Sequence, residues 1–89
     1  MCLYRAWLLY RPAATFADVE ETGLKRFGAN VRKAREASGF SQESFALHAK
    51  IGRSLYGRIE RGEQNVELTT VLRLAMALEI KAADLFEGV

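Results

Sequence analysis

Three arginines in the second half of the chain have a spacing that would place them on one side of a helix. At about 100° per residue, Arg53, Arg58 and Arg61 fall within an arc of about 140°. Ser54 and Gly57 lie in the same arc. Arginine can donate paired hydrogen bonds to guanine edges or bind phosphates, and a glycine allows close approach. This face therefore predicts a helix that enters the major groove of DNA.

The opposite side of this segment is apolar, because Tyr56 and Ile59 lie there. It must pack against other parts of the chain. Leu55 lies at the edge of the arginine face, where it could touch a thymine methyl group, but we expect it to pack on its neighbours. The alternative for the arginines is an ordinary solvated face, since charge on an exposed helix face is common.

A second short helix is expected directly before the arginine helix. Ser41 is a good N-cap for a helix over 42–49, and residues 50–52 break the pattern. Gly62 would end the arginine helix, because glycine tolerates the left-handed conformation. The inward-facing residues of the first helix would be Phe45, Ala46 and Ala49.

Further helices are expected on both sides of this pair. Thr15 and Asp18 resemble a capping box for a short helix over 16–22, which Gly23 interrupts. Apolar spacings of three and four predict helices over 24–38 and 68–78, and a short segment over 82–86 would close the base. Their expected core residues are Leu24, Phe27, Val31, Ala34 and Ser38, then Leu68, Val71, Leu74, Ala75 and Leu78, then Leu85 and Phe86.

Composition indicates one small all-α domain and argues against several functions. The chain has 89 residues, of which 49% are hydrophobic, and one proline. A single cysteine, Cys2, cannot form an internal disulfide, so the reducing cytoplasm is the expected compartment. One cysteine and one histidine cannot make a zinc site, and no catalytic group accompanies His48, which we expect on the surface. We therefore expect no enzyme activity, metal, cofactor, small-molecule ligand or membrane span.

Charge is distributed unevenly, although the net charge is only +2. Residues 24–39 carry five lysines or arginines and one glutamate, whereas residues 66–89 carry two basic and four acidic residues. Such polarity would orient the protein on a polyanion.

Residues 1–23 form an apolar N-terminal arm with the short helix, and residues 24–89 form the predicted DNA-binding domain. The arm, MCLYRAWLLYRPAA, includes Trp7, and three alternatives remain for it: it covers the domain's own core, contacts a second subunit or is disordered. Leu72 and Met76 are four residues apart and lie off the core side of their helix. They are therefore further candidates for a dimer contact.

The stretch from Phe27 to Phe86 resembles the phage Cro/repressor type of helix-turn-helix domain, also called the xenobiotic response element (XRE) family. The family's first two helices are similar to VRKAREASGFSQESFA, its turn and recognition helix to IGRSLYGRIERG, and its fourth helix to TTVLRLAMALEI. The resemblance implies a compact five-helix, lambda-repressor-like fold. The segment RSLYGRIERGEQN further resembles controller proteins of restriction–modification systems.

The resemblance also implies roles for individual residues. Arg35 and Glu60 would form a structural ion pair between the first helix and the recognition helix. Arg53, Ser54 and Arg58 fall on base-reading positions, and Gln42 falls on a phosphate-contacting position. Arg61, Gln64 and Asn65 would lie near the sugar-phosphate backbone. The candidate DNA-binding residues are therefore Ser41, Gln42, Arg53, Ser54, Leu55, Gly57, Arg58, Arg61, Gln64 and Asn65.

Four features depart from the family pattern. Lys50 replaces the usual glycine of the turn, which predicts a strained backbone there. Gly52 and Glu67 replace hydroxyl caps, which should cost only stability. Leu47 and Leu55 put apolar side chains where the family is polar.

These observations predict a transcriptional regulator that binds a pseudo-palindromic operator in double-stranded DNA as a homodimer. A restriction–modification controller, a toxin–antitoxin regulator and a phage-type regulator remain alternatives within that class. A protein-interaction module, such as an antitoxin or a coactivator-like domain, is the alternative from another class. It would use the apolar arm and the helix over 68–78.

Overall fold

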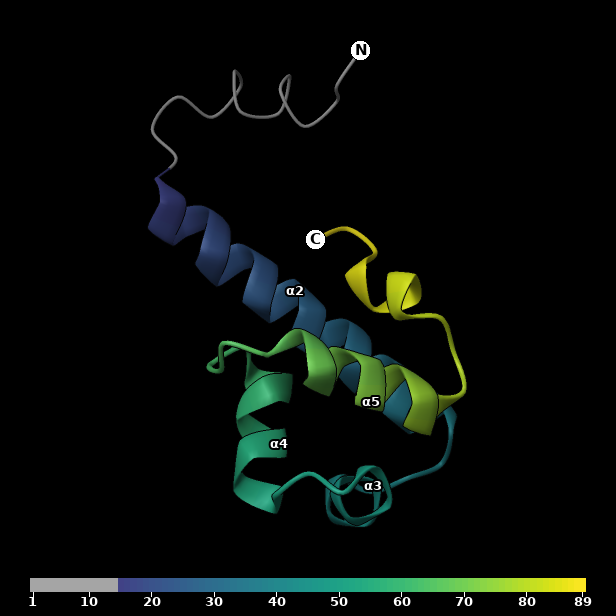
Figure 1. The fold of residues 1–89 in the computed structure, drawn as a ribbon. Helices are drawn as coiled ribbons and strands as arrows, with labels where there is room; N and C mark the ends of the chain where they lie inside the picture. Colours follow the sequence, from purple (N-terminus) through teal and green to yellow (C-terminus); the bar gives the residue numbers. More distant parts are fainter. Residues whose placement is uncertain (1–14) are drawn as a thin grey trace.

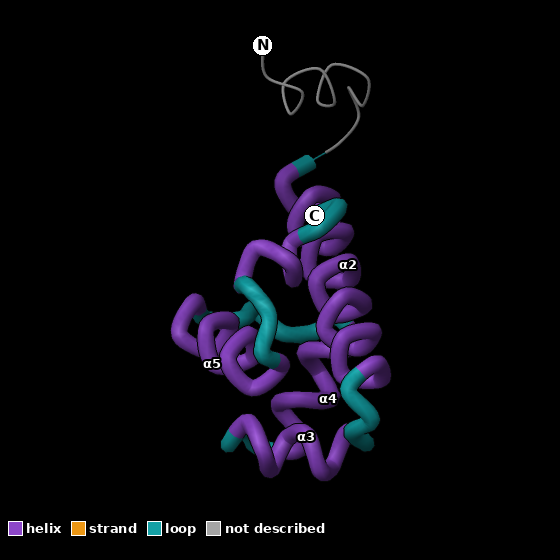
Figure 2. Tube along the Cα trace, turned by 90° about the vertical axis from the view of Figure 1, so that its right-hand side faces the viewer, coloured by secondary structure: helices purple, strands orange, loops and turns teal. Residues whose placement is uncertain are grey.

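The computed structural model describes residues 15–89, and every regular element in this part of the chain is helical (Figure 1). The elements are α2 (Phe16–Ala37), α3 (Gln42–Ala49), α4 (Arg53–Arg61), α5 (Leu68–Leu78) and the 3-10 helix η1 (Ala82–Phe86). The predicted all-α class and the predicted bounds of α3, α4 and α5 are confirmed. Both views place α3 and α4 at the opposite end of the molecule from the C-terminus (Figures 1 and 2).

The predicted break at Gly23 is wrong, because α2 runs without interruption through this residue. The predicted capping box at its start is present: Thr15 Oγ1 accepts from the Asp18 backbone N–H at 3.1 Å, and Asp18 accepts from the Thr15 N–H at 3.0 Å. A glycine inside a helix costs only about 1 kcal/mol relative to alanine. The capped first turn and the packing of the following turns outweigh that cost.

The turn between α3 and α4 has the strained geometry that its sequence predicted. Lys50 adopts a left-handed conformation with φ of 58°, and Gly52 is the N-cap of α4 without a side-chain hydrogen bond. Ser41 caps α3 as expected, since its hydroxyl accepts from the Ser44 N–H at 3.1 Å. Gly62 ends α4 with φ of 73°, a conformation that glycine adopts without penalty.

One hydrophobic core joins all five elements. Its most deeply buried large side chains come from α2, α3, α4, α5 and η1: Val31, Phe45, Tyr56, Ile59, Leu74 and Leu85. Leu55 is partly buried and packs against this core, as expected. Phe45, Ala46 and Ala49 are buried, which confirms the predicted inward face of α3.

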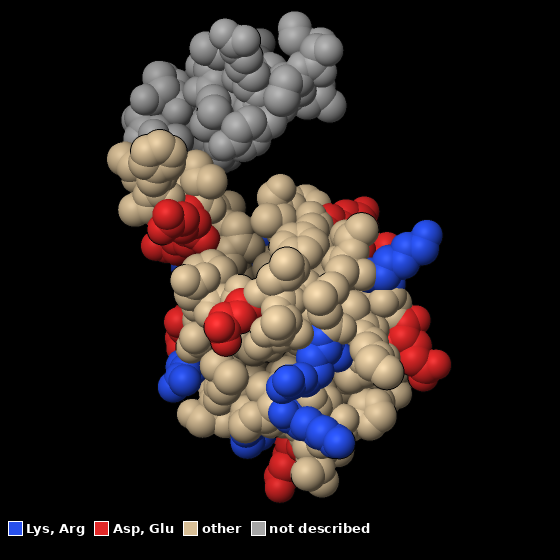
Figure 3. Space-filling view, viewed as in Figure 1, with Lys and Arg blue, Asp and Glu red and all other residues tan. Residues whose placement is uncertain are grey.

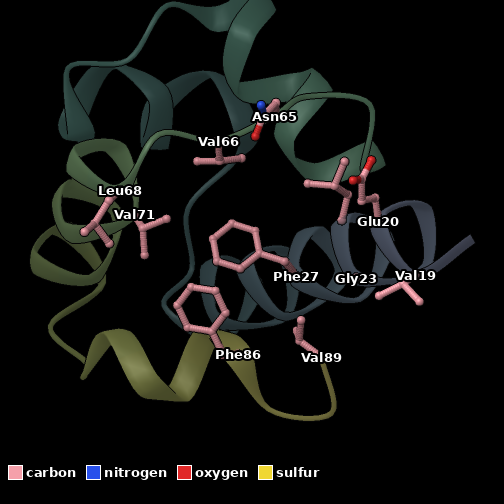
Figure 4. A pocket seen from close by; sticks show the side chains of 11 residues that line it. Val19, Glu20, Gly23, Phe27, Asn65, Val66, Leu68, Val71, Phe86 and Val89 are labelled. Atoms are coloured by element: carbon pink, nitrogen blue, oxygen red, sulfur yellow. The ribbon is translucent and has the colours of Figure 1, made fainter. Parts of the chain in front are cut away.

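Four predicted core residues lie elsewhere. Leu24 is partly buried and lines the groove between α2 and α5 rather than the core. Leu68 begins α5 and is 68% exposed, and Ser38 is an exposed C-cap of α2. Phe86 is 44% exposed, although its ring packs on Phe27 with 5.2 Å between ring centroids. Leu68 and Phe86 line a shallow, mostly apolar groove between the first half of α2 and the start of α5 (Figure 4). No described element covers this groove, and apolar spacing along the sequence could not predict this.

The contact between α2 and α4 depends on a glycine that the sequence did not single out. A Cβ added to Gly28 would lie 2.6 Å from the Glu60 carbonyl oxygen and closer still to the Ile59 carbonyl oxygen. The two backbones therefore approach each other at a point where no side chain fits.

Within residues 15–89, no helix is both long and apolar enough to cross a bilayer.

Replacing Gly28 with alanine should destabilise the domain, because its new methyl group meets rigid backbone. We expect Gly28→Ala to lower the free energy of unfolding by about 1–3 kcal/mol. Gly23→Ala is the matched control: its Cβ would meet only Val89 Cγ1 at 3.6 Å, and alanine should raise stability by about 0.5–1 kcal/mol. Urea denaturation measures both changes, and equal stability of the two variants would contradict the close approach.

Candidate nucleic-acid interface

The exposed side of α4 carries the arginines that the sequence analysis placed together. Arg53, Arg58 and Arg61 are exposed, as is Ser54, while Tyr56 and Ile59 are buried. Helix α4 thus presents its basic side to solvent because its apolar side is held in the core. One face of the molecule shows basic side chains interspersed with acidic ones (Figure 3).

Each of the three arginines is held by an acceptor from the same chain. Arg53 Nη2 donates to Gln42 Oε1 at 2.6 Å, and Arg58 Nε donates to Gln64 Oε1 at 3.2 Å. Arg61 Nε forms an exposed ion pair with Glu63 Oε1 at 3.0 Å. Two of these acceptors are neutral amides, which a base edge or a phosphate oxygen could replace without breaking an ion pair.

Gly57 lies on the same side of α4 but is buried. The position of its missing Cβ lies 2.9 Å from Arg53 Nη1 and 3.2 Å from Arg61 Nη1. The expected open approach to this glycine is therefore absent from the unbound structure, because guanidinium groups cover it.

A buried ion pair fixes α4 to α2, as the resemblance implied. Arg35 Nε donates to Glu60 Oε2 at 2.7 Å, and Arg35 Nη2 donates to Glu60 Oε1 at 3.3 Å. Arg35 Nη1 also donates to the Phe40 carbonyl oxygen at 2.7 Å, which ties in the turn before α3. Both charged groups are almost fully buried, with side-chain exposures of 9% and 2%. Their charges therefore compensate each other inside the core.

Two further donors complete the surroundings of Glu60. The Tyr56 hydroxyl donates to Glu60 Oε2, and Gln42 Nε2 donates to Glu60 Oε1 at 2.8 Å. Gln42 thus joins the buried carboxylate to Arg53 on the exposed face. This chain of contacts was not predicted from the sequence, although Tyr56 and Glu60 are four residues apart and face the same way.

These contacts shift the pKa values of all three ionisable groups in directions that keep the network intact. Burial alone would raise the pKa of Glu60, but hydrogen bonds from Arg35, Tyr56 and Gln42 outweigh it and lower this pKa. Burial and the hydrogen bond to Glu60 raise the pKa of Tyr56, so its hydroxyl stays a donor. The hydrogen bond to Glu60 raises the pKa of Arg35 despite burial.

The remaining predicted site residues lie at the two ends of this face. Ser41 is exposed at the start of α3, where its hydroxyl is used in the cap. Both ends of the Gln42 side-chain amide are engaged, so a phosphate contact through it would replace an internal hydrogen bond. Gln64 is half-buried and donates to the Asn65 carbonyl oxygen at 3.2 Å, in the loop after α4.

The dimer candidates are only partly covered by the structure. Leu72 and Met76 are 53% and 83% exposed on α5, which confirms that they lie off its core side. Trp7 and the rest of residues 1–14 lie outside the described residues. His48 is exposed and stacks on Phe40 with 5.0 Å between ring centroids, as a surface residue would. Residues 15–89 contain no group of three or more His, Cys, Asp or Glu side chains arranged to hold a metal.

Neutralising Glu60 should strongly destabilise the domain. Glu60→Gln leaves the Arg35 guanidinium buried without its counter-charge, and we expect a loss of about 3–5 kcal/mol in the free energy of unfolding. Chemical denaturation at neutral pH measures this loss. Glu21→Gln is the control, because it removes the carboxylate of an exposed pair with Lys25 and should cost at most about 1 kcal/mol.

The contribution of Glu60 should also depend on pH. The folded pKa lies below the ordinary value of 4.5, so the stabilisation is present above that pH and is lost as pH falls through the folded pKa. The difference in unfolding free energy between wild type and Glu60→Gln should therefore shrink in acid below about pH 4.5. A difference that stays constant through this range would contradict the lowered pKa.

Comparisons with known proteins identify a matching family and several relatives. The model of the HTH_3 helix-turn-helix family matches residues 31–85. The chain is 37% identical over 65 residues to control protein C.MunI of a Mycoplasma species, covering 72% of this chain and 88% of that protein. It is 36% identical over 70 residues to control protein C.SmaI of Serratia marcescens, covering 79% of each.

A solved structure shows the same fold at a higher identity. The restriction–modification controller protein C.AhdI from Aeromonas hydrophila has a TM-score of 0.69 and 44% identity, covering 71% of this chain and 96% of that one. The family match runs through α3, α4 and α5, the elements that carry and support the arginine face. The chain therefore belongs to the helix-turn-helix family of Cro/repressor (XRE) type.

Proposed function

We propose that this chain, a DNA-binding transcriptional regulator, binds a pseudo-palindromic operator as a homodimer with α4 in the major groove. The observation that carries the proposal is the exposed arginine face of a helix whose opposite side is buried. A helix held in this way can enter a groove as a rigid unit. The relatives that this chain resembles are named as control or controller proteins, which are regulators rather than enzymes.

The side chains of α4 divide into two groups in this proposal. Arg53, Ser54 and Arg58 contact base edges, where each good arginine–guanine pair discriminates by about 1–3 kcal/mol. Residues at the edges of the face contact the sugar-phosphate backbone, which fixes orientation rather than sequence. The backbone group is Ser41, Gln42, Arg61, Gln64 and Asn65.

The dimer surface is proposed on α5. Leu72 and Met76 expose apolar surface there without a partner from residues 15–89. A two-fold axis at this surface would present two copies of α4, with half-sites about 34 Å apart. Trp7 of the arm remains a further candidate for this contact.

The biological role that we favour is control of a restriction–modification system. The supporting observation is that C.MunI, C.SmaI and C.AhdI are named as control or controller proteins. A regulator of a toxin–antitoxin pair would use the same fold and is distinguished by the neighbouring genes. A protein-interaction module would use the apolar side of α5, and its affinity would respond weakly to salt.

The first test is binding to DNA from upstream of the chain's own gene and to a scrambled duplex, at two salt concentrations. Arg53→Ala and Arg58→Ala should each weaken selective binding by about 1–3 kcal/mol, because each removes a base contact. Wild-type affinity should fall steeply with salt. Fluorescence anisotropy measures both effects.

Arg26→Ala is the matched control for these variants. It removes the same charge from α2, where the guanidinium lies beside Gly88 near the C-terminus. Its effect on selectivity should be small. Equal binding of the wild type to both duplexes, unchanged in Arg53→Ala and Arg58→Ala, would rule out operator binding through α4.

The second test concerns the dimer. Leu72→Glu combined with Met76→Glu should give monomers at concentrations where the wild type is dimeric, because charge cannot be buried at an apolar interface. Sedimentation equilibrium measures the mass. Leu47→Glu is the control, since Leu47 is 81% exposed on α3 and lies outside the proposed interface. A dimer that survives the α5 changes must use another surface.

A further inference from the structure

Neither the packing of the core nor the backbone conformation explains why residue 57 is a glycine. It lies inside α4 rather than at a turn, where glycine costs helix stability relative to alanine. Its φ is not in the left-handed region, unlike that of Gly62. Gly28 must lack a side chain because backbone atoms of α4 lie against it, but no core or distant backbone atom lies near the Cβ position of Gly57.

The atoms that do lie there belong to the arginine face. Only Arg53 Nη1 at 2.9 Å and Arg61 Nη1 at 3.2 Å come within 4 Å of the missing Cβ, apart from chain neighbours and the backbone of the helix itself. Real Cβ atoms essentially never have contacts as short as the first. The two guanidinium groups, from the preceding and the following turn, therefore converge over the bare backbone of this residue.

Both guanidinium groups are also held on their outer sides. Arg53 donates to Gln42 at 2.6 Å, and Gln42 donates in turn to the buried Glu60 at 2.8 Å. Arg61 is paired with Glu63 at 3.0 Å. A methyl group at residue 57 would push Arg53 away from its seat and strain its hydrogen bond to Gln42. Ordered side chains lose less rotamer freedom on binding than mobile ones.

We infer that Gly57 is a positioning residue whose missing side chain seats the guanidinium groups of Arg53 and Arg61 for DNA binding. The inference rests on the proposed function and extends it, because the glycine acts through the arginines rather than through direct contact with DNA. It predicts that a glycine at this position lowers the stability of α4 and raises the affinity for DNA. Alanine should therefore stabilise the fold and weaken binding at the same time.

The test compares Gly57→Ala with Gly23→Ala, the other glycine inside a helix whose Cβ would meet no backbone. Both variants should raise the melting temperature by a few degrees, because alanine is the better helix former. Only Gly57→Ala should weaken binding to the duplex from upstream of the gene, by about tenfold, which corresponds to the ordering cost of two side chains. Circular dichroism and fluorescence anisotropy provide these measurements.

A second readout follows the arginines directly. In the free protein, Gly57→Ala should shift the NMR signals of the Nε–H groups of Arg53 and Arg61 and leave that of Arg58 unchanged. Unchanged signals for both seated arginines, a lower melting temperature, or unchanged affinity beside selective wild-type binding would each overturn the inference. Wild-type binding that does not distinguish the two duplexes would overturn the proposed function instead, while the NMR signals would still report whether the seat exists.

Discussion

The arrangement of this domain depends on the buried ion pair between Arg35 of α2 and Glu60 of α4. Burying either charge alone would be strongly unfavourable, so the two helices must keep the register that brings them together. Gly28 permits the required approach, because a side chain there would meet the backbone of α4. One electrostatic requirement and one steric requirement thus select the same crossing of the two helices. That crossing determines which side of α4 remains in solvent.

The same network reaches the surface. Glu60 accepts from Tyr56 within the core and from Gln42 at its edge, and Gln42 accepts from Arg53. A chain of hydrogen bonds therefore runs from the interior to the arginine face. Gln42 is neutral, so its hydrogen bond does not compensate the positive charge of Arg53. Arg61 differs, because the carboxylate of Glu63 compensates its charge. Each arginine of the face thus has an acceptor from the same chain, and only the charge of Arg61 is neutralised by a carboxylate.

Much of the fold could be predicted from local sequence signals. Ser41 and Gly62 delimit α3 and α4 because caps depend on residues within one turn of the helix end. The two sides of α4 followed from helical spacing, and Lys50 was correctly expected in a strained turn. The break at Gly23 was wrong because a modest intrinsic penalty was treated as decisive. Leu68 was misplaced because spacing identifies an apolar side but not the element that covers it.

The sequence by itself determined the helices, the polar and apolar sides of each helix, and the grouping of three arginines on the polar side of α4. These properties depend on residues within about two turns of each other. Only the tertiary structure decided that Gly28 lies against α4, that Gln42 links Glu60 to Arg53, and that guanidinium groups cover Gly57. The first two arise between segments distant in the chain, and the third depends on where those contacts hold the arginine side chains. Helical periodicity carries no information about the partner that a side chain meets across the fold.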